Sequence, residues 1–490
     1  MLKKLLAALL AACAVLTFAA CDKEDTKTPD TNPDITVTDP NKPDKADKAD
    51  KTDDETKIDY TSDLSTDRYD GYNYRMLVRK GKVSDQYLEE DSEDLVESAT
   101  YKRNKEVEER YGITITVSES SDSNYETDAL NSILAGDDAY DLIFAHSRAA
   151  FVYAIQGAAV NYNDVKSIHL DKPWWTQDIT ESCNINGKLY VLDGDISSAG
   201  LGATMCLFFN KRIFDENGYD YPYESVKEGD WTFDEFAYYA KKGGSDLNGD
   251  GVMDPEVDQY GFRAEEWESP MNILYTGGQK IYNKNDEGEL ELTLYSTKTV
   301  EIYDEYFSLL NNESCIIFTR TNGYKGSKMF SEGRAMFTDT ELRHAQTLRN
   351  MDDDFGILPY PKFDEDDAYA TATNGGSHLL VIPITVSDVE RTGAITEALC
   401  AIGSRDVIPA FYEKSLKSKY ARDEESEEMI DIIRASRVYD IGYVAGGTFQ
   451  SCGFDLANST NHDFASYYAA GETAAKVKLA EFNRDYAGLE

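Results

Sequence analysis

The chain has 490 residues, enough for one large two-lobed body or for two to three ordinary domains. Its 49 Lys and Arg residues against 91 Asp and Glu residues give a net charge of −42, which argues against binding to nucleic acid or to anionic lipid. Because 41% of the residues are hydrophobic and 12% are aromatic, most of the chain is expected to fold. Five histidines leave little room for histidine-based chemistry.

The first twenty residues have the pattern of a secretory signal. Residues 1–4 carry two lysines, Lys3 and Lys4, and residues 5–20 are apolar except for Thr17. The boundary resembles a bacterial lipobox, which predicts cleavage before Cys21 and a palmitate-type lipid anchor on that cysteine. Cys13 fits the local pattern as well, but cleavage there would leave an apolar stub at the new amino terminus. A plain signal peptide with an incidental cysteine is the other alternative.

A polar segment follows the signal. Residues 21–66 are rich in Lys, Asp, Thr and Pro, and they include a repeat at 44–51. Such a composition cannot bury enough apolar surface to offset the entropy of ordering, so we predict a disordered acidic and lysine-rich tether. The other cysteines have no spacing typical of zinc or of a disulfide scaffold, and we expect mostly buried free thiols with one disulfide possible. They are Cys183, Cys206, Cys315, Cys400 and Cys452.

From residue 72 onward, strand-like and helix-like segments alternate. Alternating or β-branched runs predict strands, and apolar residues at helical spacing predict helices. This alternation indicates a mainly parallel sheet with helices on both faces. The predicted strands are 72–79, 113–117, 140–145, 205–210, 335–338 and 355–358. Residues 104–110 are predicted to form the end of a helix, and further helices are predicted at 130–134, 148–155, 232–242, 297–310 and 464–486. The last of these lies in a tail that is predicted to be mostly helical from residue 388 onward.

A series of short motifs follows in a fixed order. They are 140–148 (YDLIFAHSR), 185–190 (INGKLY), 207–214 (LFFNKRIF), 230–236 (DWTFDEF), 259–262 (QYGF), 330–336 (FSEGRAM), 355–361 (FGILPYP) and 381–383 (VIP). Each motif is short, but together and in this order they resemble the maltose-type extracellular solute-binding proteins, family 1. Those proteins are the lipoprotein or periplasmic receptors of ABC sugar importers.

The resemblance implies an α/β, periplasmic-binding-protein-like fold of two lobes, with the ligand in the cleft between them. Each lobe would be a mainly parallel sheet flanked by helices. Lobe 1 would hold 68–198 plus 382–404, and lobe 2 would hold 202–378 plus 408–490. The implied protein is an extracytoplasmic, lipid-anchored monomer that captures an oligosaccharide and delivers it to the transmembrane subunits of an ABC permease.

A sugar site needs a flat aromatic ring for the C–H faces and charged or amide groups for the hydroxyls. His146, Ser147 and Arg148 follow a predicted strand, at the sheet edge where open α/β sheets bind ligands. The related proteins have an acid where this chain has Ser147. We therefore expect Arg148, with His146 beside it, to contact the ligand; the alternative is an arginine that caps a helix or pairs on the surface.

The resemblance also places an acid and a stacking aromatic ring shortly before the glycines 277–278. Counting back assigns these roles to Glu265 and Trp267, with packing between the lobes as the alternative for Trp267. Trp174, Trp175 and Trp231 are expected to be structural. The further ligand candidates are Asp339 and Glu341 after a predicted strand, Asn374 near a lobe crossover, and the tail aromatics Tyr443 and Phe449.

The sharpest local motif spans residues 246–258. Oxygen-bearing side chains stand at every second position, with glycine at the turn, as in the EF-hand calcium loop. The acid expected at the last position is replaced by Val257, between Glu256 and Asp258. We predict a structural Ca²⁺, with an acidic turn without metal as the alternative. The predicted ligands are Asp246, Asn248, Asp250, the carbonyl of Val252, and Asp254.

Motifs of enzymes are missing from the sequence. It contains no HExxH, no GxSxG, no phosphate-binding P-loop and no complete GxGxxG. We therefore predict a binding protein without catalytic residues. An extracellular glycoside hydrolase is one rival, because so many carboxylates always supply some facing pair. A surface carbohydrate-adhesion protein is the other, since it would also carry an anchor and a tether.

Overall fold

The computed structural model describes residues 58–120, 125–318, 327–348, 350–416 and 424–489. The predicted signal 1–20, the lipidated Cys21 and the tether up to residue 57 lie outside the described residues. Residues 58–66, predicted as the end of the tether, instead contact the folded body. Leu64 is buried, and carbonyl oxygens of this segment accept hydrogen bonds from Arg110 at 3.4–3.5 Å. The predicted tether is therefore too long at this end, because one buried leucine and these bonds fix the segment.

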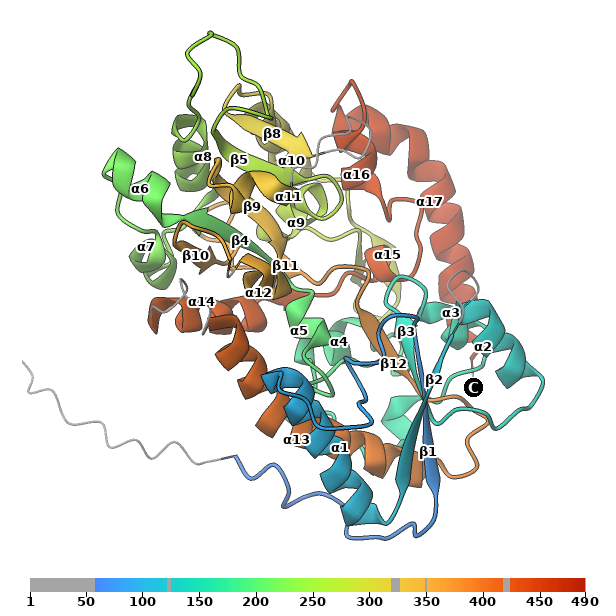
Figure 1. The fold of residues 1–490 in the computed structure, drawn as a ribbon. Helices are drawn as coiled ribbons and strands as arrows, with labels where there is room; N and C mark the ends of the chain where they lie inside the picture. The colour runs from blue at the N-terminus through green and yellow to red at the C-terminus, as the bar shows by residue number, and fades with distance from the viewer. Residues whose placement is uncertain (1–57, 121–124, 319–326, 349, 417–423, 490) are drawn as a thin grey trace, which may run out of the picture. The chain divides into compact units, whose positions relative to one another are not determined.

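The first sheet has the strand order β12-β3-β1-β2. β3 and β2 run parallel to β1, and β12 runs antiparallel to β3. The sheet thus joins strands from early in the chain to one from much later (Figure 1). Helix α1 packs against helix α13 beside it. The bounds are β1 Asn73–Val78, β2 Thr114–Glu119, β3 Leu142–His146, β12 His378–Val381, α1 Leu95–Tyr111 and α13 Val389–Leu416.

The second sheet has the strand order β10-β4-β9-β5-β8. β4 is antiparallel to both of its neighbours, whereas β9, β5 and β8 run parallel to one another. In each of the two sheets, all strands but one therefore point the same way, which agrees with the predicted mainly parallel arrangement. The bounds are β4 Met205–Asn210, β5 Tyr260–Glu265, β8 Cys315–Phe318, β9 Ala335–Glu341 and β10 Phe355–Leu358.

Helices and two small sheets complete the described part of the chain. The helices are α2 Tyr125–Leu134, α3 Phe151–Ile155, α4 Gln177–Ser182, α5 Ala199–Gly202, α6 Lys211–Asn217, α7 Tyr223–Glu228, α8 Phe233–Lys242, α9 Ser269–Thr276, α10 Thr297–Leu310, α11 Ser327–Ser331, α12 Ala345–Leu348, α14 Glu424–Ala435, α15 Ile441–Val444, α16 Cys452–Ala457 and α17 Phe464–Ala487, with 3₁₀ turns η1 Tyr162–Asp164 and η3 Leu342–His344. The small sheets pair β6 Tyr282–Lys284 with β7 Leu290–Leu292, and β11 Thr371–Ala372 with β13 Arg437–Val438.

The C-terminal helix α17 contacts segments from both halves of the chain. Phe482 packs against Phe151 of α3, with ring centres 6.1 Å apart. Asn483 Nδ2 donates a hydrogen bond of 2.8 Å to the carbonyl of Leu290 in β7.

β12 belongs to the first sheet and begins at residue 378. The division into lobes at the residues given above stays a prediction.

The buried core contains the residues that were expected to be structural. Trp174, Trp175 and Trp231 are buried, and Trp231 Nε1 donates to the carbonyl of Pro359 at 3.1 Å. The five cysteines of the described residues are all buried and free, so none of them forms the disulfide that was left open. Among the described helices, none is both long and apolar enough to cross a membrane.

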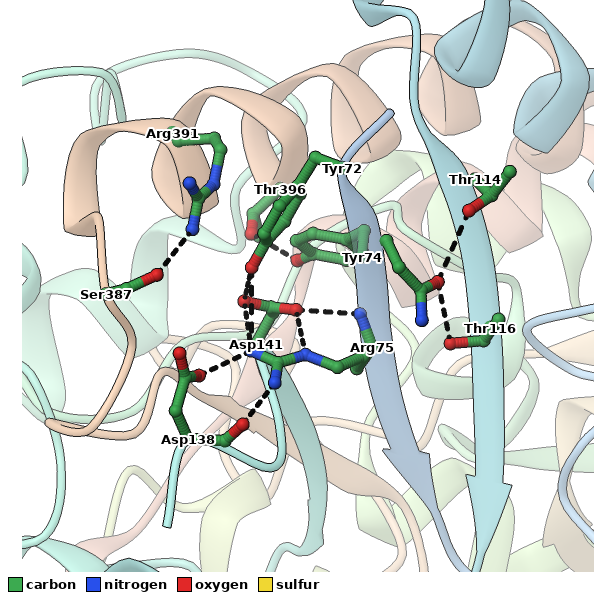
Figure 2. Close-up of polar contacts among 11 residues, drawn as sticks. Tyr72, Tyr74, Arg75, Thr114, Thr116, Asp138, Asp141, Ser387, Arg391 and Thr396 are labelled. Carbon is green, nitrogen blue, oxygen red and sulfur yellow. Dashed lines mark hydrogen bonds and ion pairs between the residues drawn. The ribbon is translucent and has the colours of Figure 1, made fainter. Parts of the chain in front are cut away.

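A polar cluster at the amino ends of β1 and β3 fixes the first sheet (Figure 2). The fully buried carboxylate of Asp141 accepts hydrogen bonds from the backbone N–H of Arg75 at 2.8 Å and from its Nε at 2.9 Å. The hydroxyl of Tyr72 donates to the same carboxylate. Arg391 of α13 lies over the Tyr72 ring, 3.5 Å from its centre. This cluster joins α13 to the end of the sheet at which β1 and β3 begin. Arg148 lies at the opposite end, just after β3 stops.

Candidate ligand-binding site

A cavity of about 450 Å³ lies at the carboxyl ends of β5 and β9. Its volume is within the range of small-molecule pockets. Charged, hydroxyl-bearing, aromatic and apolar side chains share its lining, which suits a ligand with both polar and C–H surfaces. The lining residues are Met205, Arg263, Glu265, Trp267, Glu268, Phe330, Ser331, Thr338, Thr340, Glu341, His344, Thr347, Leu348 and Asn374.

Three of the predicted ligand residues meet at one edge of this cavity. The guanidinium carbon of Arg148 lies 5.3 Å from the centre of the Trp267 ring and 5.4 Å from the centre of the Tyr443 ring. Both distances are typical of cation–π contacts. Arg148 Nε is buried and has no hydrogen-bond partner among the described residues. The segments after β3 and after β5, with the helix α15, therefore place one cation between two aromatic rings.

Trp267 is stacked on a ring that the sequence did not point to. Phe454 of α16 lies parallel to it, with ring centres 3.8 Å apart and an angle of 13° between the planes. Trp267 is partly buried and also lines the cavity. The two rings form an aromatic platform at the cavity edge, in which Phe454 fixes the plane of the indole.

The predicted acid, Glu265, is one member of a carboxyl pair. Its Oε2 accepts the backbone N–H groups of Trp267 at 2.7 Å and Glu268 at 3.0 Å. Burial raises the pKa of Glu268 well above its ordinary value, and the hydrogen bond to Glu265 and the charges of Glu265 and Glu341 add to this effect. Burial also acts against ionisation of Glu265, but the hydrogen bonds that it accepts, together with the charge of Arg263, outweigh the effect of burial and lower its pKa. At neutral pH the pair therefore holds one proton, on Glu268.

Asn374 lies where the chain returns from the second sheet to the first. Its Nδ2 donates to Glu268 Oε1, and its backbone N–H donates to the carbonyl of Ala203 at 2.8 Å. The next residue, Gly375, has no room for a side chain, because a Cβ atom there would lie 2.3 Å from Arg148 Cδ. Asn374 thus ties the crossover to the carboxyl pair, and Gly375 lets it approach Arg148.

Asp339 and His146 support the site from outside the cavity lining. Asp339 is fully buried, and its carboxylate accepts the backbone N–H of Glu265 at 2.8 Å and the hydroxyl of Tyr360 at 2.5 Å. Burial raises the pKa of Asp339 to about 6. His146 Nδ1 accepts the backbone N–H of Arg148 at 3.2 Å, and burial together with the charges of Arg79 and Arg148 lowers its pKa to about 4. A neutral His146 therefore holds the turn that presents Arg148.

Of the two other predicted candidates, Glu341 lines the cavity and Phe449 does not. Glu341 lines the cavity, and its carboxylate pairs with Arg343. Phe449 is buried and stacks on Tyr468 of α17, with ring centres 5.1 Å apart, so it packs in the core. Sequence reasoning missed Glu268, although it stands three residues after Glu265, a spacing that can bring two side chains together at a helix start.

The predicted calcium loop has a regular pattern of internal hydrogen bonds. Asp246 Oδ1 and Oδ2 accept the N–H groups of Gly249 and Gly251, each at 2.7 Å. Asp250 Oδ1 accepts the N–H of Val252 at 2.8 Å. The oxygen-only donor set suits Ca²⁺ chemically, but among the described residues no three Asp, Glu, His or Cys side chains lie close enough to hold a metal ion. The acids of the loop thus stand apart in this arrangement, and binding of the ion would bring them together.

Comparisons with known proteins show the family and the fold of the chain. The sequence profile of the family described as bacterial extracellular solute-binding protein matches residues 102–401, more than half of the chain. No curated protein sequence matches the chain significantly.

Several solved structures share the fold at low sequence identity. They include UspC of M. tuberculosis (12% identity, TM-score 0.57, 82% of this chain and 100% of that chain). UgpB of Mycobacterium tuberculosis in complex with glycerophosphocholine has 14% identity and a TM-score of 0.56, over 84% and 99% of the chains. The GacH receptor of Streptomyces glaucescens, solved unliganded and with acarbose, has 12% identity and a TM-score of 0.53, over 86% and 100%. The expected two-lobed α/β fold is thereby confirmed, and the chain belongs to the family of bacterial extracellular solute-binding proteins.

Proposed function

We propose that the protein captures a carbohydrate, an oligosaccharide rather than a single sugar, and delivers it to the transmembrane subunits of an ABC importer. The observation that carries this proposal is the contact of Arg148 with Trp267 and Tyr443 beside the 450 Å³ cavity. An aromatic face suits the C–H surface of a sugar, and the charged and amide groups suit its hydroxyls. Membership of an extracellular family puts the protein outside the cytoplasm.

Capture works by closure around the ligand. Arg148 follows a strand of the first sheet, whereas Trp267 follows a strand of the second. A ligand that contacts both side chains gains more free energy in the closed arrangement than in an open one, and that difference shifts the population toward closure. In such a motion we expect the chain to bend where it crosses between the two sheets, near Asn374.

The carboxyl pair favours binding over catalysis. A glycoside hydrolase needs two carboxyl groups about 5–9.5 Å apart, with the scissile bond between them. Glu265 and Glu268 are hydrogen-bonded to each other instead, and Glu268 is also engaged by Asn374. This pair therefore lacks the separation that the hydrolysis needs. We therefore propose a protein without enzymatic activity, and turnover of a bound oligosaccharide that one carboxylate substitution abolishes would favour the hydrolase.

A thermal-shift screen over monosaccharides and oligosaccharides tests the proposed function directly. A ligand at one hundred times its Kd adds about 2.7 kcal/mol to the free energy of unfolding, which is a measurable rise in Tm. Stabilisation by a sugar, followed by sugar uptake that depends on this protein in cells, is the expected result. Binding without dependent uptake would favour the adhesion protein, and no stabilisation by any sugar would contradict the carbohydrate proposal.

The membrane anchor is a separate proposal that rests on the sequence. The basic start, the apolar run and Cys21 support cleavage and lipidation at that residue. Metabolic labelling with a palmitate analogue should label the wild-type protein and Cys13→Ser but not Cys21→Ser. Equal labelling of the two variants would contradict this assignment, and loss of label in Cys13→Ser would move the site to Cys13.

We also propose that the loop 246–258 takes up a structural Ca²⁺. Five oxygen donors at alternating positions support it: Asp246, Asn248, Asp250, the carbonyl of Val252, and Asp254. The ion would neutralise acids that otherwise crowd one exposed loop, and so it would brace the loop. No step of ligand capture depends on it.

A further inference from the structure

A second, much smaller cavity lies at the carboxyl end of the first sheet. Its volume is about 20 Å³, and a space of roughly 10–15 Å³ or more by this measure accepts one water-sized group. Residues that end β1 and begin β12 form its walls, together with residues near α5 and η3. They are Val78, Arg79, Lys82, Asp85, Gln86, Phe144, Ala199, Arg343, Gly376, Ser377 and His378.

Three polar side chains of this lining are more than nine-tenths buried and each has an unpartnered atom. Gln86, Ser377 and His378 are 2%, 6% and 7% exposed. Among the described residues, nothing makes a hydrogen bond to Gln86 Oε1, Ser377 Oγ or His378 Nε2. A buried polar atom without a partner is costly. Three such atoms, on three residues that line one water-sized space, therefore point to a group that enters it.

The chemistry of the three atoms selects that group. Gln86 Nε2 already donates to Ser197 Oγ at 3.0 Å, which leaves its carbonyl oxygen as an acceptor without a partner among the described residues. Ser377 can donate or accept. Burial lowers the pKa of His378, and the positive charges of Arg79 and Lys82 act in the same direction, while Asp193 and Asp85 oppose them. A neutral imidazole has one donor and one acceptor nitrogen. An oxygen that both donates and accepts suits this set. A carboxylate cannot donate to Gln86 Oε1, and both a carboxylate and a phosphate are too large for a space of about 20 Å³.

The small cavity adjoins the large one. Glu341 lines the large cavity and pairs with Arg343, which lines the small one, through a hydrogen bond of 2.5 Å. Asn374 lines the large cavity, and its Oδ1 accepts the N–H of Gly376 of the small one at 2.6 Å. The walls of the two cavities are therefore joined by hydrogen bonds at two points, and the small cavity is the nearest place for a substituent of a ligand in the large one to enter.

We propose that Gln86, Ser377 and His378 form a subsite that receives one hydroxyl group of the bound carbohydrate, an inference that rests on the proposed function. The same three atoms hold a water molecule when no ligand is present. The subsite makes one hydroxyl position of the ligand a determinant of specificity, because a ligand without that hydroxyl leaves the three buried atoms unpaired.

The test uses Ser377→Ala and the matched control Ser415→Ala. Ser415, in α13, is also fully buried, its Oγ also has no partner among the described residues, and it does not line the cavity. The probe is whichever of D-glucose, D-galactose, D-xylose, D-mannose or their linear oligomers stabilises the wild-type protein most. Isothermal titration should show about tenfold weaker binding to Ser377→Ala and unchanged binding to Ser415→Ala. A crystal structure of the complex should place a sugar hydroxyl within hydrogen-bond distance of the three atoms.

Two outcomes would overturn the inference in different ways. If the wild-type protein binds a sugar, but Ser377→Ala binds it equally well and the complex keeps a water in the small cavity, then the subsite is a structural water site and the proposed function stands. If the wild-type protein binds no sugar of the panel, the carbohydrate function fails and the hydroxyl subsite fails with it.

Discussion

The guanidinium of Arg148 lies over the indole ring of Trp267, 5.3 Å from its centre. These residues are far apart in the sequence, and each follows a strand of a different sheet. Their contact places a cation and an aromatic face at the edge of one cavity. Any ligand that enters the cavity at this edge must share or displace that contact, so Trp267 is the first residue to test.

Replacement of Trp267 by alanine should weaken sugar binding about tenfold or more. A sugar face stacked on a large aromatic ring is worth on the order of 1–3 kcal/mol, comparable to burial of a large apolar side chain. Isothermal titration with the sugar that the thermal-shift screen identifies measures the loss. Circular dichroism should show that the fold persists.

Phe454→Leu is the control for this variant. It removes the ring on which Trp267 stacks but leaves the indole itself in the cavity lining. Its effect on affinity should be smaller than that of Trp267→Ala. If Trp267→Ala unfolds the protein or binds as well as the wild type, Trp267 packs the structure and does not contact the ligand.

Glu268 should make the protein less stable as the pH rises. Its pKa is raised above the ordinary value of 4.5, so the folded protein keeps a proton that the unfolded chain has already released. The stability from this proton is complete below the ordinary pKa and falls as the pH rises toward the raised pKa. Glu268→Gln should reduce the decline in Tm between about pH 5 and about pH 8 and should be more stable than the wild type at the upper end.

Glu268→Gln should have this effect because glutamine has the same hydrogen-bond donor and acceptor groups as the protonated acid. Its amide can donate to Glu265 and accept from Asn374, as the protonated Glu268 does. Glu289→Gln, at an exposed position, is the control and should leave the slope unchanged. A Glu268→Gln protein whose Tm follows pH with the wild-type slope would show that the pair does not hold a shared proton.

Much of the fold was predictable because local sequence determines it. The helix α10 and the strand β10 have the predicted bounds, since their apolar spacing and flanking residues act within one segment. The helix α3 begins at Phe151, three residues later than predicted, because the backbone N–H of Arg148 bonds to His146 and forms a turn first. The apolar spacing that predicts a helix does not show that a side chain will accept this backbone N–H.

The site was predictable only in part. Arg148 and Trp267 were assigned to one cleft, and they do come together. The stacking of Phe454 on Trp267 and the bond from Asn374 to Glu268 join segments more than a hundred residues apart. No spacing in the sequence encodes such contacts, because they depend on how the helices pack.

Asp141 should be essential for the stability of the first sheet. Its fully buried carboxylate accepts three hydrogen bonds from Arg75 and one from Tyr72, so Asp141→Asn removes the buried charge that these donors face and leaves the partly buried Arg75 with Asp138 as its only paired acid among the described residues. Leaving buried hydrogen-bond donors without their charged acceptor costs about 1–3 kcal/mol. Urea denaturation should show a loss in this range.

Asp138→Asn is the matched control for Asp141→Asn. Asp138 pairs with the same arginine at 2.5 Å, but its side chain is 40% exposed, and exposed ion pairs contribute about 0–1 kcal/mol. A much smaller loss is therefore expected for this variant. Equal losses in the two variants would mean that burial of Asp141 does not set the energy of the cluster.

Calcium should raise the melting temperature if the loop 246–258 binds it. The ion takes six to eight oxygens, and the loop offers Asp246, Asn248, Asp250, Asp254 and the carbonyl of Val252. The acids must converge from their described positions, so the loop orders on binding and the binding energy adds to the free energy of unfolding. Tm measured with calcium, with magnesium and with EDTA should be highest with calcium. Asp246→Asn should abolish the difference, whereas Asp220→Asn, at an exposed acid outside the loop, should preserve it. A protein whose Tm is the same with calcium and with EDTA, and which retains no calcium after dialysis, has an acidic turn here and no metal site.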